Sequence, residues 1–143
     1  MIIREAETKD AEAIERLYKE LLPNNTKIKV LEDRIEEIKQ NPNSFLFICE
    51  VDQEIVATAH LHLCLDALIE SQPFGVVERV VVSGNRQGLG YGSLIMKHIE
   101  DLCISRDCVK VFLTSGASRK QAHEFYTKLG YDGDSSKAFK KYL

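Results

Sequence analysis

The 143-residue chain lacks three features that mark whole classes of protein. It has no apolar run long enough to cross a bilayer, and its first residues, MIIREAETKD, lack the apolar centre of a signal peptide. It has no block of like charge, and its formal net charge of -3 predicts no general affinity for nucleic acid or anionic membranes. We therefore expect a cytoplasmic protein of one domain, residues 1–143, whose partners include neither nucleic acid nor a membrane.

The cysteines are also uninformative as a ligand set. Cys49, Cys64, Cys103 and Cys108 form no Cys-x-x-Cys pair, and their spacing fits no zinc template. Most lie in apolar segments, where a free cysteine behaves as a small hydrophobic residue. This pattern favours a reducing compartment and predicts no metal site, and no motif supports acyl-cysteine chemistry.

Apolar periodicity predicts the order β-α-α-β-β-β-α-β-α-β, an α/β fold with helices packed on a mixed sheet. Asp52-Gln53 reads as a hairpin turn, Pro23 ends the first helix, and Gly130 stands at a helix C-cap. The tail SSKAFKKYL is expected to add a last strand. The other expected strands cover about 2–4, 44–51, 54–65, 75–82 and 109–115, and the expected helices about 10–22, 31–39, 92–106 and 118–129.

Three glycines, Gly88, Gly90 and Gly92, stand between a Val-rich strand and a helix in the stretch NRQGLGYGS. Glycine costs backbone entropy, so a ligand that approaches the backbone closely explains them better than an ordinary turn. Successive free N–H groups at a helix N-terminus suit a pyrophosphate. A Walker loop would need Lys-Ser or Lys-Thr after the last glycine. A dinucleotide fingerprint would need G-x-G-x-x-G and an acidic residue on the next strand, and this chain has neither pattern.

QGLGYG, at 87–92, matches the Q/R-x-x-G-x-G/A signature of the GNAT superfamily of N-acetyltransferases. RKQAHEFYTKLGY, at 119–131, resembles the A-x-x-x-Y-x-x-x-G-F/Y ending of that family, and ERVVV resembles its fourth strand. The resemblance implies a mixed, mostly antiparallel sheet with helices on both faces, in which the fourth and fifth strands run parallel and splay apart. It also implies direct transfer of an acetyl group from the co-substrate acetyl-CoA to a primary amine. Homodimers are common among such relatives.

The resemblance also assigns the co-substrate to particular residues. The backbones of Val80 and Val82 would hydrogen-bond to the pantetheine arm. Arg119 stands where relatives often carry Asn; its guanidinium could reach the CoA phosphates or stay exposed in the first turn of a helix. The backbone amides that would hold the pyrophosphate belong to Gln87, Gly88, Leu89, Gly90, Tyr91, Gly92 and Ser93.

The chemistry needs a neutral amine, an oxyanion donor and a route for the thiolate to leave. Tyr126 matches the family's tyrosine near the CoA sulfur and is the candidate acid; the alternative is a core tyrosine beside Phe125. Glu78, a charge within VVERVVV, is the candidate base, directly or through a water. It could instead pair with an arginine or bind the amine as an anion, and many relatives use no dedicated base. The amide of Val80 could stabilise the oxyanion.

His60 and His62 alternate along one strand and so project to the same face. They could line the acceptor site or accept a proton from the amine, or they could simply be half-exposed strand residues beneath a helix. No third ligand stands at a spacing that suits a metal. Asp66 and Glu70, in the loop before Pro73, would suit a small cationic acceptor, although surface loops are commonly polar.

Two questions stay open at the level of sequence. The acceptor amine could belong to a small molecule or to a protein, and the acyl group could be longer than acetyl. A non-catalytic acyl-CoA-binding module, acting as a sensor or partner subunit, would keep the same glycine loop. Tyr126 favours catalysis over that alternative.

Overall fold

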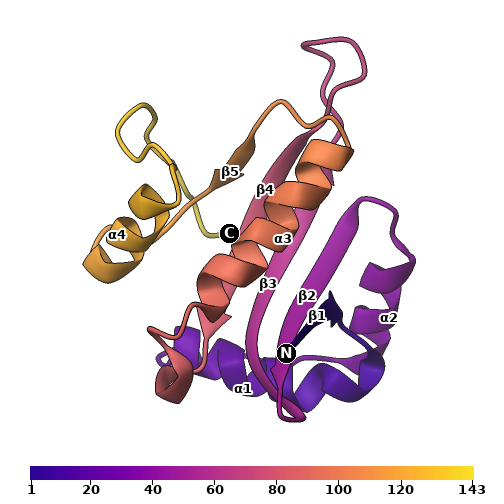
Figure 1. The fold of residues 1–143 in the computed structure, drawn as a ribbon, viewed down its shortest axis with the longest axis vertical. Helices are drawn as coiled ribbons and strands as arrows, with labels where there is room; N and C mark the ends of the chain where they lie inside the picture. Colours follow the sequence, from indigo (N-terminus) through magenta and orange to yellow (C-terminus); the bar gives the residue numbers. More distant parts are fainter. The chain divides into compact units, whose positions relative to one another are not determined.

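The computed structural model describes residues 1–143, which form two compact units, residues 1–112 and 113–143. In the first unit, β1 (Ile2–Glu5), β2 (Ser44–Val51), β3 (Glu54–Cys64) and β4 (Phe74–Val82) lie side by side in chain order as antiparallel pairs (Figure 1). β5 (Val111–Leu113) continues the sheet beside β4, in parallel. The expected mixed, mostly antiparallel sheet is confirmed.

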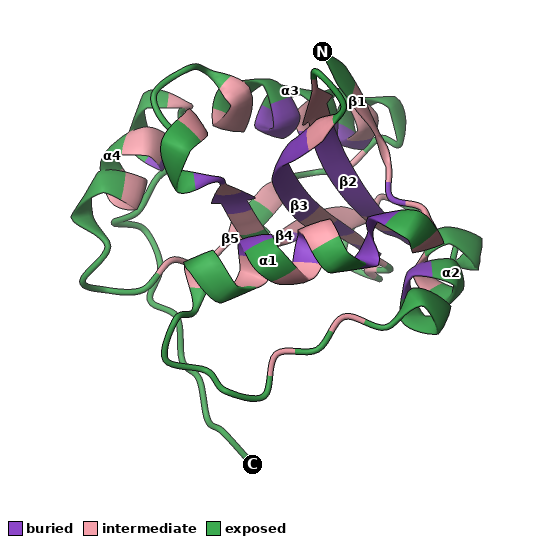
Figure 2. Ribbon diagram, turned by 90° about the horizontal axis from the view of Figure 1, so that it is seen from below, coloured by how far each residue is buried: buried purple, intermediate pink, exposed green.

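Helices cover both faces of this sheet. Figure 2 shows β2, β3 and β4 between α1 (Ala11–Leu21) on one side and α3 (Tyr91–Ser105) on the other. α2 (Glu32–Gln40) joins α1, because its Ile35 lies in the same buried cluster as Ile14 and Leu17. Buried α3 residues recur at helical spacing as Ile95, Met96, Ile99 and Cys103. The apolar stripes read from the sequence are therefore the faces that meet the sheet.

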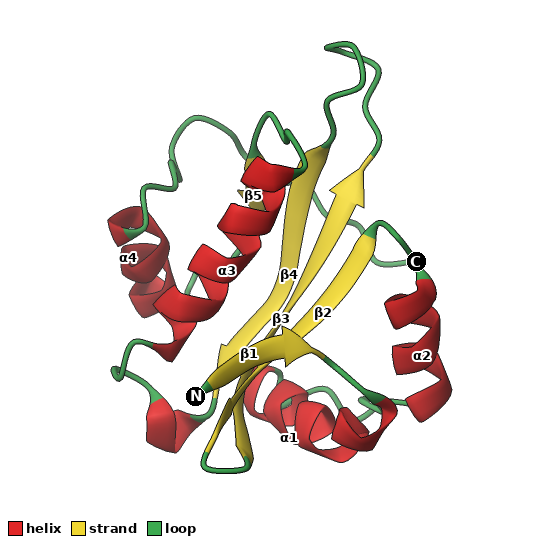
Figure 3. Ribbon diagram, turned by 45° about the vertical axis from the view of Figure 1, so that its right-hand side comes forward, coloured by secondary structure: helices red, strands yellow, loops and turns green.

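The β2–β3 connection confirms the predicted hairpin turn (Figure 3). Asp52 and Gln53 both adopt positive φ, 50° and 66°. Two consecutive left-handed residues define a type I′ turn, whose twist matches that of the flanking strands. Glycine or asparagine is preferred at such positions, so this turn carries backbone strain.

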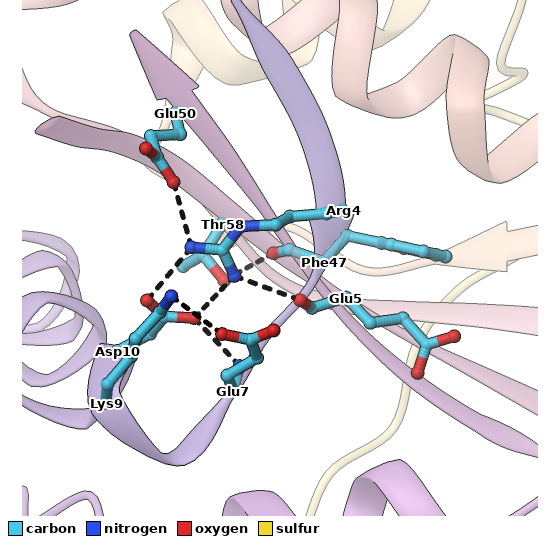
Figure 4. A network of polar contacts seen from close by, with 8 residues as sticks. All are labelled: Arg4, Glu5, Glu7, Lys9, Asp10, Phe47, Glu50 and Thr58. Carbon is cyan, nitrogen blue, oxygen red and sulfur yellow. Dashed lines mark hydrogen bonds and ion pairs between the residues drawn. The ribbon is translucent and has the colours of Figure 1, made fainter. Parts of the chain in front are cut away.

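The N-terminal strand is tied to its surroundings by one arginine. Figure 4 shows the guanidinium of Arg4 reaching Asp10, at 2.7 Å, and Glu50, at 2.9 Å. Burial acts to raise the pKa of the Asp10 carboxyl, but hydrogen bonds from Arg4 and from the Glu7 amide outweigh it and lower that pKa. The Arg4 network thus joins β1, the turn before α1, and β2.

In the second unit, α4 (Lys120–Lys128) ends at Gly130, which has φ 95°. The amide of Gly130 donates to the carbonyl of Thr127, and the amide of Tyr131 donates to the carbonyl of Tyr126. This pair of bonds is the Schellman motif, so the predicted glycine C-cap is confirmed.

The predicted last strand is wrong, because residues 131–143 contain no helix or strand. The aromatic side chains of Phe139 and Tyr142 are 90% and 86% exposed, and lysines separate them. Such a segment offers no continuous apolar face for a sheet to bury. No helix of the structure is long and apolar enough to span a membrane.

Candidate active site

The stretch between β4 and α3 consists of a short 3-10 helix, η2 (Gly84–Arg86), followed by a turn built on two left-handed glycines. Gly88 has φ 77°, and Gly90, at the N-cap of α3, has φ 90°. A Cβ at either position would meet no atom within 4 Å, so crowding by the protein does not explain these glycines. Gly92 differs, since it lies inside α3 and lacks a positive φ. Backbone conformation therefore accounts for Gly88 and Gly90 but not for Gly92.

The backbone amides of this stretch are free. No described hydrogen bond within the protein uses an amide from Gln87 through Ser93; Leu94 is the first to donate, to the carbonyl of Gly90 at 3.1 Å. The four leading amides of any helix lack an intrahelical acceptor, and the dipole of the 15-residue α3 adds partial positive charge at this end. Residues 87–93 therefore present a continuous row of N–H donors that suits an anion.

Side chains from distant parts of the chain fix this turn. The carboxylate of Glu20, in α1, accepts a hydrogen bond of 2.9 Å from the amide of Gly84. Arg86 forms an ion pair of 2.8 Å with Glu54 of β3, and the hydrogen bond from Arg86 lowers the pKa of Glu54. Gln87 Nε2 donates to the carbonyl of Val82 at 3.2 Å. Sequence analysis missed Glu20 and Glu54 as anchors, since no local pattern marks a partner so far along the chain.

β4 contains a β-bulge in its second half. It carries one more residue than β3 between Glu78 and Val81, so the register shifts there. Arg79, inside the bulge, has φ 56°, a left-handed conformation that costs a side-chain-bearing residue about 1–2 kcal/mol. The bulge separates Glu78 from Val80, the two β4 residues with proposed chemical roles.

The bulge also changes which residues face which helix. A Cβ at Gly75 would lie 2.9 Å from Cys103 Sγ, so this part of β4 packs directly under α3. Val82 packs against the same buried cluster as Tyr91 of α3, although Val82 is an odd number of positions from Gly75. Strict alternation would put Gly75 and Val82 on opposite faces of the sheet. Because of the bulge they share the α3 face, and Val81 instead joins the cluster under α1.

β5 reaches only the start of β4. The amide of Gly75 donates to the carbonyl of Lys110 at 3.0 Å, and the amide of Val109 donates to the carbonyl of Pro73 at 3.0 Å. β5 has three residues and β4 has nine, so β5 can pair with only part of β4. Val80 and Val82 lie at the opposite end of β4 from these bonds.

His60, His62 and Glu78 come together on the α1 face. His60 pairs directly with Glu78 across β3 and β4. The His60 and His62 rings lie 4.0 Å apart between centroids, and His60 Nε2 shares a hydrogen bond of 2.7 Å with Ser44 Oγ. Burial, then the neighbouring His62 and Arg79, lower the pKa of His60 to about 4, so its ring is neutral at pH 7. The shared face predicted for the two histidines is confirmed, and the structure adds Ser44.

Glu78 and Arg79 are both half-exposed, with a closest approach of 3.7 Å. That separation is an ion pair without a short hydrogen bond. The alternative that Glu78 pairs with an arginine is thus met, and that arginine is the next residue in the chain, Arg79. Asp66, expected beside the cleft, uses its carboxylate to accept a hydrogen bond from the amide of Leu68.

Tyr126 and Arg119 belong to the second unit. Tyr126 is buried in α4, 5.0 Å from the Phe125 ring and 6.0 Å from the Tyr131 ring between centroids. Burial raises the pKa of its phenol, which therefore stays protonated at neutral pH. Arg119 is exposed at the N-cap of α4. The Schellman motif at Gly130 fixes Tyr131 against Tyr126, a physical reason for the Y-x-x-x-G-Y spacing.

Two other features carry no site. Across residues 1–143, no group of three or more His, Cys, Asp or Glu could hold a metal ion. A wide hollow beside α1 is lined by Arg4, Glu15, Glu54 and other charged side chains. These three are already paired, and no predicted site residue lines the hollow.

Comparison with known proteins agrees with this architecture. A curated relative, aminoalkylphosphonate N-acetyltransferase from Salmonella typhimurium, is 25% identical over 129 residues, covering 90% of this chain and 83% of that protein. A candidate acetyltransferase from Agrobacterium tumefaciens superposes with a TM-score of 0.90 at 24% identity, over 99% of this chain and 100% of the other. Glucosamine-6-phosphate N-acetyltransferase from Arabidopsis thaliana superposes with a TM-score of 0.83 at 24% identity, over 99% of this chain and 98% of the other.

The model of the acetyltransferase (GNAT) family matches residues 11–131. This match spans the glycine turn, the bulged strand and the Schellman-capped helix. The chain therefore belongs to the GNAT family of acetyltransferases.

Proposed function

We propose that this protein is an acetyl-CoA-dependent N-acetyltransferase that acts on a primary amine by direct attack. The observation that carries the proposal is the row of unused amides at 87–93, directly after the bulged strand β4. Pyrophosphate is a ligand that such a row suits, and family membership favours CoA as its source. The backbones of Val80 and Val82 are the proposed partners of the pantetheine arm.

The proposed reaction forms one C–N bond and breaks one C–S bond. The neutral amine attacks the thioester carbonyl, and the negative charge that develops on its oxygen is stabilised by the Val80 amide. The tetrahedral intermediate then expels the CoA thiolate. Tyr126 is the proposed donor of a proton to that sulfur; its phenol is protonated at neutral pH, and burial, which raises its pKa, makes that transfer less favourable.

The proton lost by the amine needs an acceptor. Glu78 is the proposed acceptor, directly or through a water, because its carboxylate lies on the α1 face and is half-exposed. The pKa of His60 is lowered to about 4, so its ring is neutral at pH 7 and offers an uncharged hydrogen-bonding group. We assign His60 and His62 to the lining of the acceptor site. Arg119 is a proposed contact for the CoA phosphates.

The test is release of CoA thiol from acetyl-CoA in the presence of an amine panel. The panel includes an aminoalkylphosphonate and an amino sugar phosphate, the substrates that the names of two similar proteins state, together with a polyamine and a lysine peptide. We expect turnover with at least one amine, and a loss of at least tenfold in kcat for Tyr126→Phe. Tyr142→Phe, at an exposed tail tyrosine, is the matched control.

The second candidate is a non-catalytic acyl-CoA-binding module, which the free amides would serve equally well. Tight acetyl-CoA binding by calorimetry, without turnover of any amine, would establish that role and refute the enzyme. The single-domain organisation, the homodimer and the cytoplasmic location stay predictions of the sequence. Analytical ultracentrifugation tests the homodimer directly.

A further inference from the structure

Arg79 is the one residue of β4 with a positive φ, and the bulge holds it there. It has φ 56° within the bulge, although any side chain disfavours that region. Backbone strain of this kind concentrates at functional sites, because a regular strand residue would be more stable. Family resemblance assigns no role to Arg79, and the proposed reaction does not use it.

The guanidinium of Arg79 has no hydrogen-bonding partner in the protein. Its side chain is 52% exposed, and the nearest carboxylate oxygen, on Glu78, is 3.7 Å away. The guanidinium groups of Arg4, Arg16 and Arg86 donate to carboxylates or carbonyls, whereas Arg106 lies over the Phe45 ring and Arg119, like Arg79, is exposed. A planar guanidinium with five N–H donors that lack an acceptor in the protein is suited to bind a carboxylate, phosphate or phosphonate.

The charge of Arg79 acts on the face that holds the histidines. It contributes to the lowered pKa of His60, and it opposes the effect of burial on the pKa of Tyr18 in α1. Both residues belong to the α1 side of the sheet, where Glu78 pairs with His60. Regular alternation would have directed Arg79 toward α3, like Gly75. The bulge explains why the charge of Arg79 instead acts on residues of the α1 face.

This face therefore offers one negative and one positive group next to each other. Glu78 can attract an ammonium, and Arg79 can attract an anion, while His60, neutral at pH 7, and Ser44 add uncharged hydrogen-bonding groups. A ligand with both charges a few bonds apart would satisfy both side chains better than they satisfy each other at 3.7 Å. A polyamine, which carries only positive charge, would place a cation against Arg79.

We propose that the acceptor is a small amine that also bears an anionic group, and that Arg79 is the specificity-determining residue that binds this anion. The inference rests on the proposed N-acetyltransferase function and narrows its acceptor class. The anion can be a carboxylate, a phosphate or a phosphonate, since a guanidinium binds all three in the same bidentate way.

The test compares amines in matched pairs that differ only in the anionic group. Ethanolamine phosphate is paired with ethanolamine, and β-alanine with β-alaninamide; 2-aminoethylphosphonate extends the anionic series. We expect a higher kcat/KM for the anionic member of at least one pair, and the best pair identifies the anion. In Arg79→Gln, the ratio of kcat/KM between the two members should fall by about 10- to 100-fold. Arg79→Lys should retain part of the preference, because it keeps the charge but not the planar fork.

Two controls separate binding from folding. Arg34→Gln removes an exposed arginine of α2 and should leave the ratio unchanged. Arg79→Asn removes the charge with a residue that tolerates the left-handed region, so it should lower the ratio without lowering Tm. This inference alone is overturned if the wild-type protein prefers the neutral members. It is also overturned if Arg79→Gln and Arg79→Asn lower kcat/KM equally for both members of each pair. Absence of turnover with every amine overturns the proposed function and this inference together.

Discussion

Replacing Gly92 with alanine separates two reasons for a glycine: a backbone conformation that other residues disfavour, and close approach of a ligand. Gly92 is the second residue of α3 and has no positive φ, so alanine there brings no backbone strain. Alanine is more stable than glycine in a helix by about 0.5–1 kcal/mol, so Gly92→Ala should make the protein more stable. Gly88→Ala and Gly90→Ala should do the opposite, by about 1–2 kcal/mol each, because φ is 77° and 90° there.

Acetyl-CoA affinity should change in the same direction for all three variants. The new methyl group at residue 92 stands within the row of free amides at 87–93. If the pyrophosphate contacts that row, the methyl removes at least one charge-assisted hydrogen bond, worth about 1.5–3 kcal/mol. The expected loss is about 10- to 100-fold in Kd. Gly92→Ala would then be a more stable protein that binds its ligand less well.

Urea unfolding and calorimetric titration with acetyl-CoA measure the two quantities independently. Gly133→Ala is the control, since Gly133 lies in the tail, has no positive φ and would place its Cβ near no other atom. An unchanged acetyl-CoA affinity in Gly92→Ala would refute the assignment of this glycine to ligand approach. Lower stability in Gly92→Ala would refute the assignment of a relaxed helical backbone.

Three further substitutions test packing, turn strain and titration. Gly75→Ala should destabilise the protein by about 1–3 kcal/mol in urea unfolding, because its Cβ would lie 2.9 Å from Cys103 Sγ and 3.2 Å from Leu61 Cδ1; adding Cys103→Ala should recover part of that loss. Gln53→Gly should stabilise the hairpin by about 1 kcal/mol, since glycine accepts φ 66° without strain, and a lower Tm would contradict the type I′ assignment. The folded state keeps the pKa of His60 near 4 whereas the unfolded value is about 6.5, so between these values the unfolded state binds more protons. The free energy of unfolding should therefore fall as pH is lowered from 6.5 toward 4, and this fall should be smaller in His60→Gln. An equal slope of unfolding free energy against pH in both proteins would contradict the lowered pKa of His60.

Most of the fold could be predicted because its signals are local. The apolar positions of α1 and α3 recur at helical spacing, and the Val-rich β4 has the composition of a buried strand. The two-residue hairpin at Asp52 was predicted from its position between strands rather than from its residues. The tail was wrongly predicted as a strand, since the lysines between Phe139 and Tyr142 leave no continuous apolar face to bury.

Only those parts of the site that consist of backbone groups within a sequence motif could be predicted. Gly88 and Gly90 identified the turn, and the Y-x-x-x-G-Y spacing identified the cap of α4. The bulge at Arg79 left no trace in the sequence, because no glycine or proline marks it. Bulge formation depends on the pairing of two strands, which a single strand's composition does not report. For the same reason the partnership of Ser44 with His60 became visible only in the fold.

The extra residue of β4 makes this strand unusually intolerant of changes in length. Deleting Arg79 would restore a regular ladder with β3, but one half of β4 would then have to turn over. Either Gly75 would leave its place under Cys103, or Val81 would leave the cluster below α1 and expose its side chain. Insertions should be tolerated in the exposed loop before Pro73. In a library of single-residue deletions, Arg79 should therefore behave as a core position even though its side chain is half in solvent.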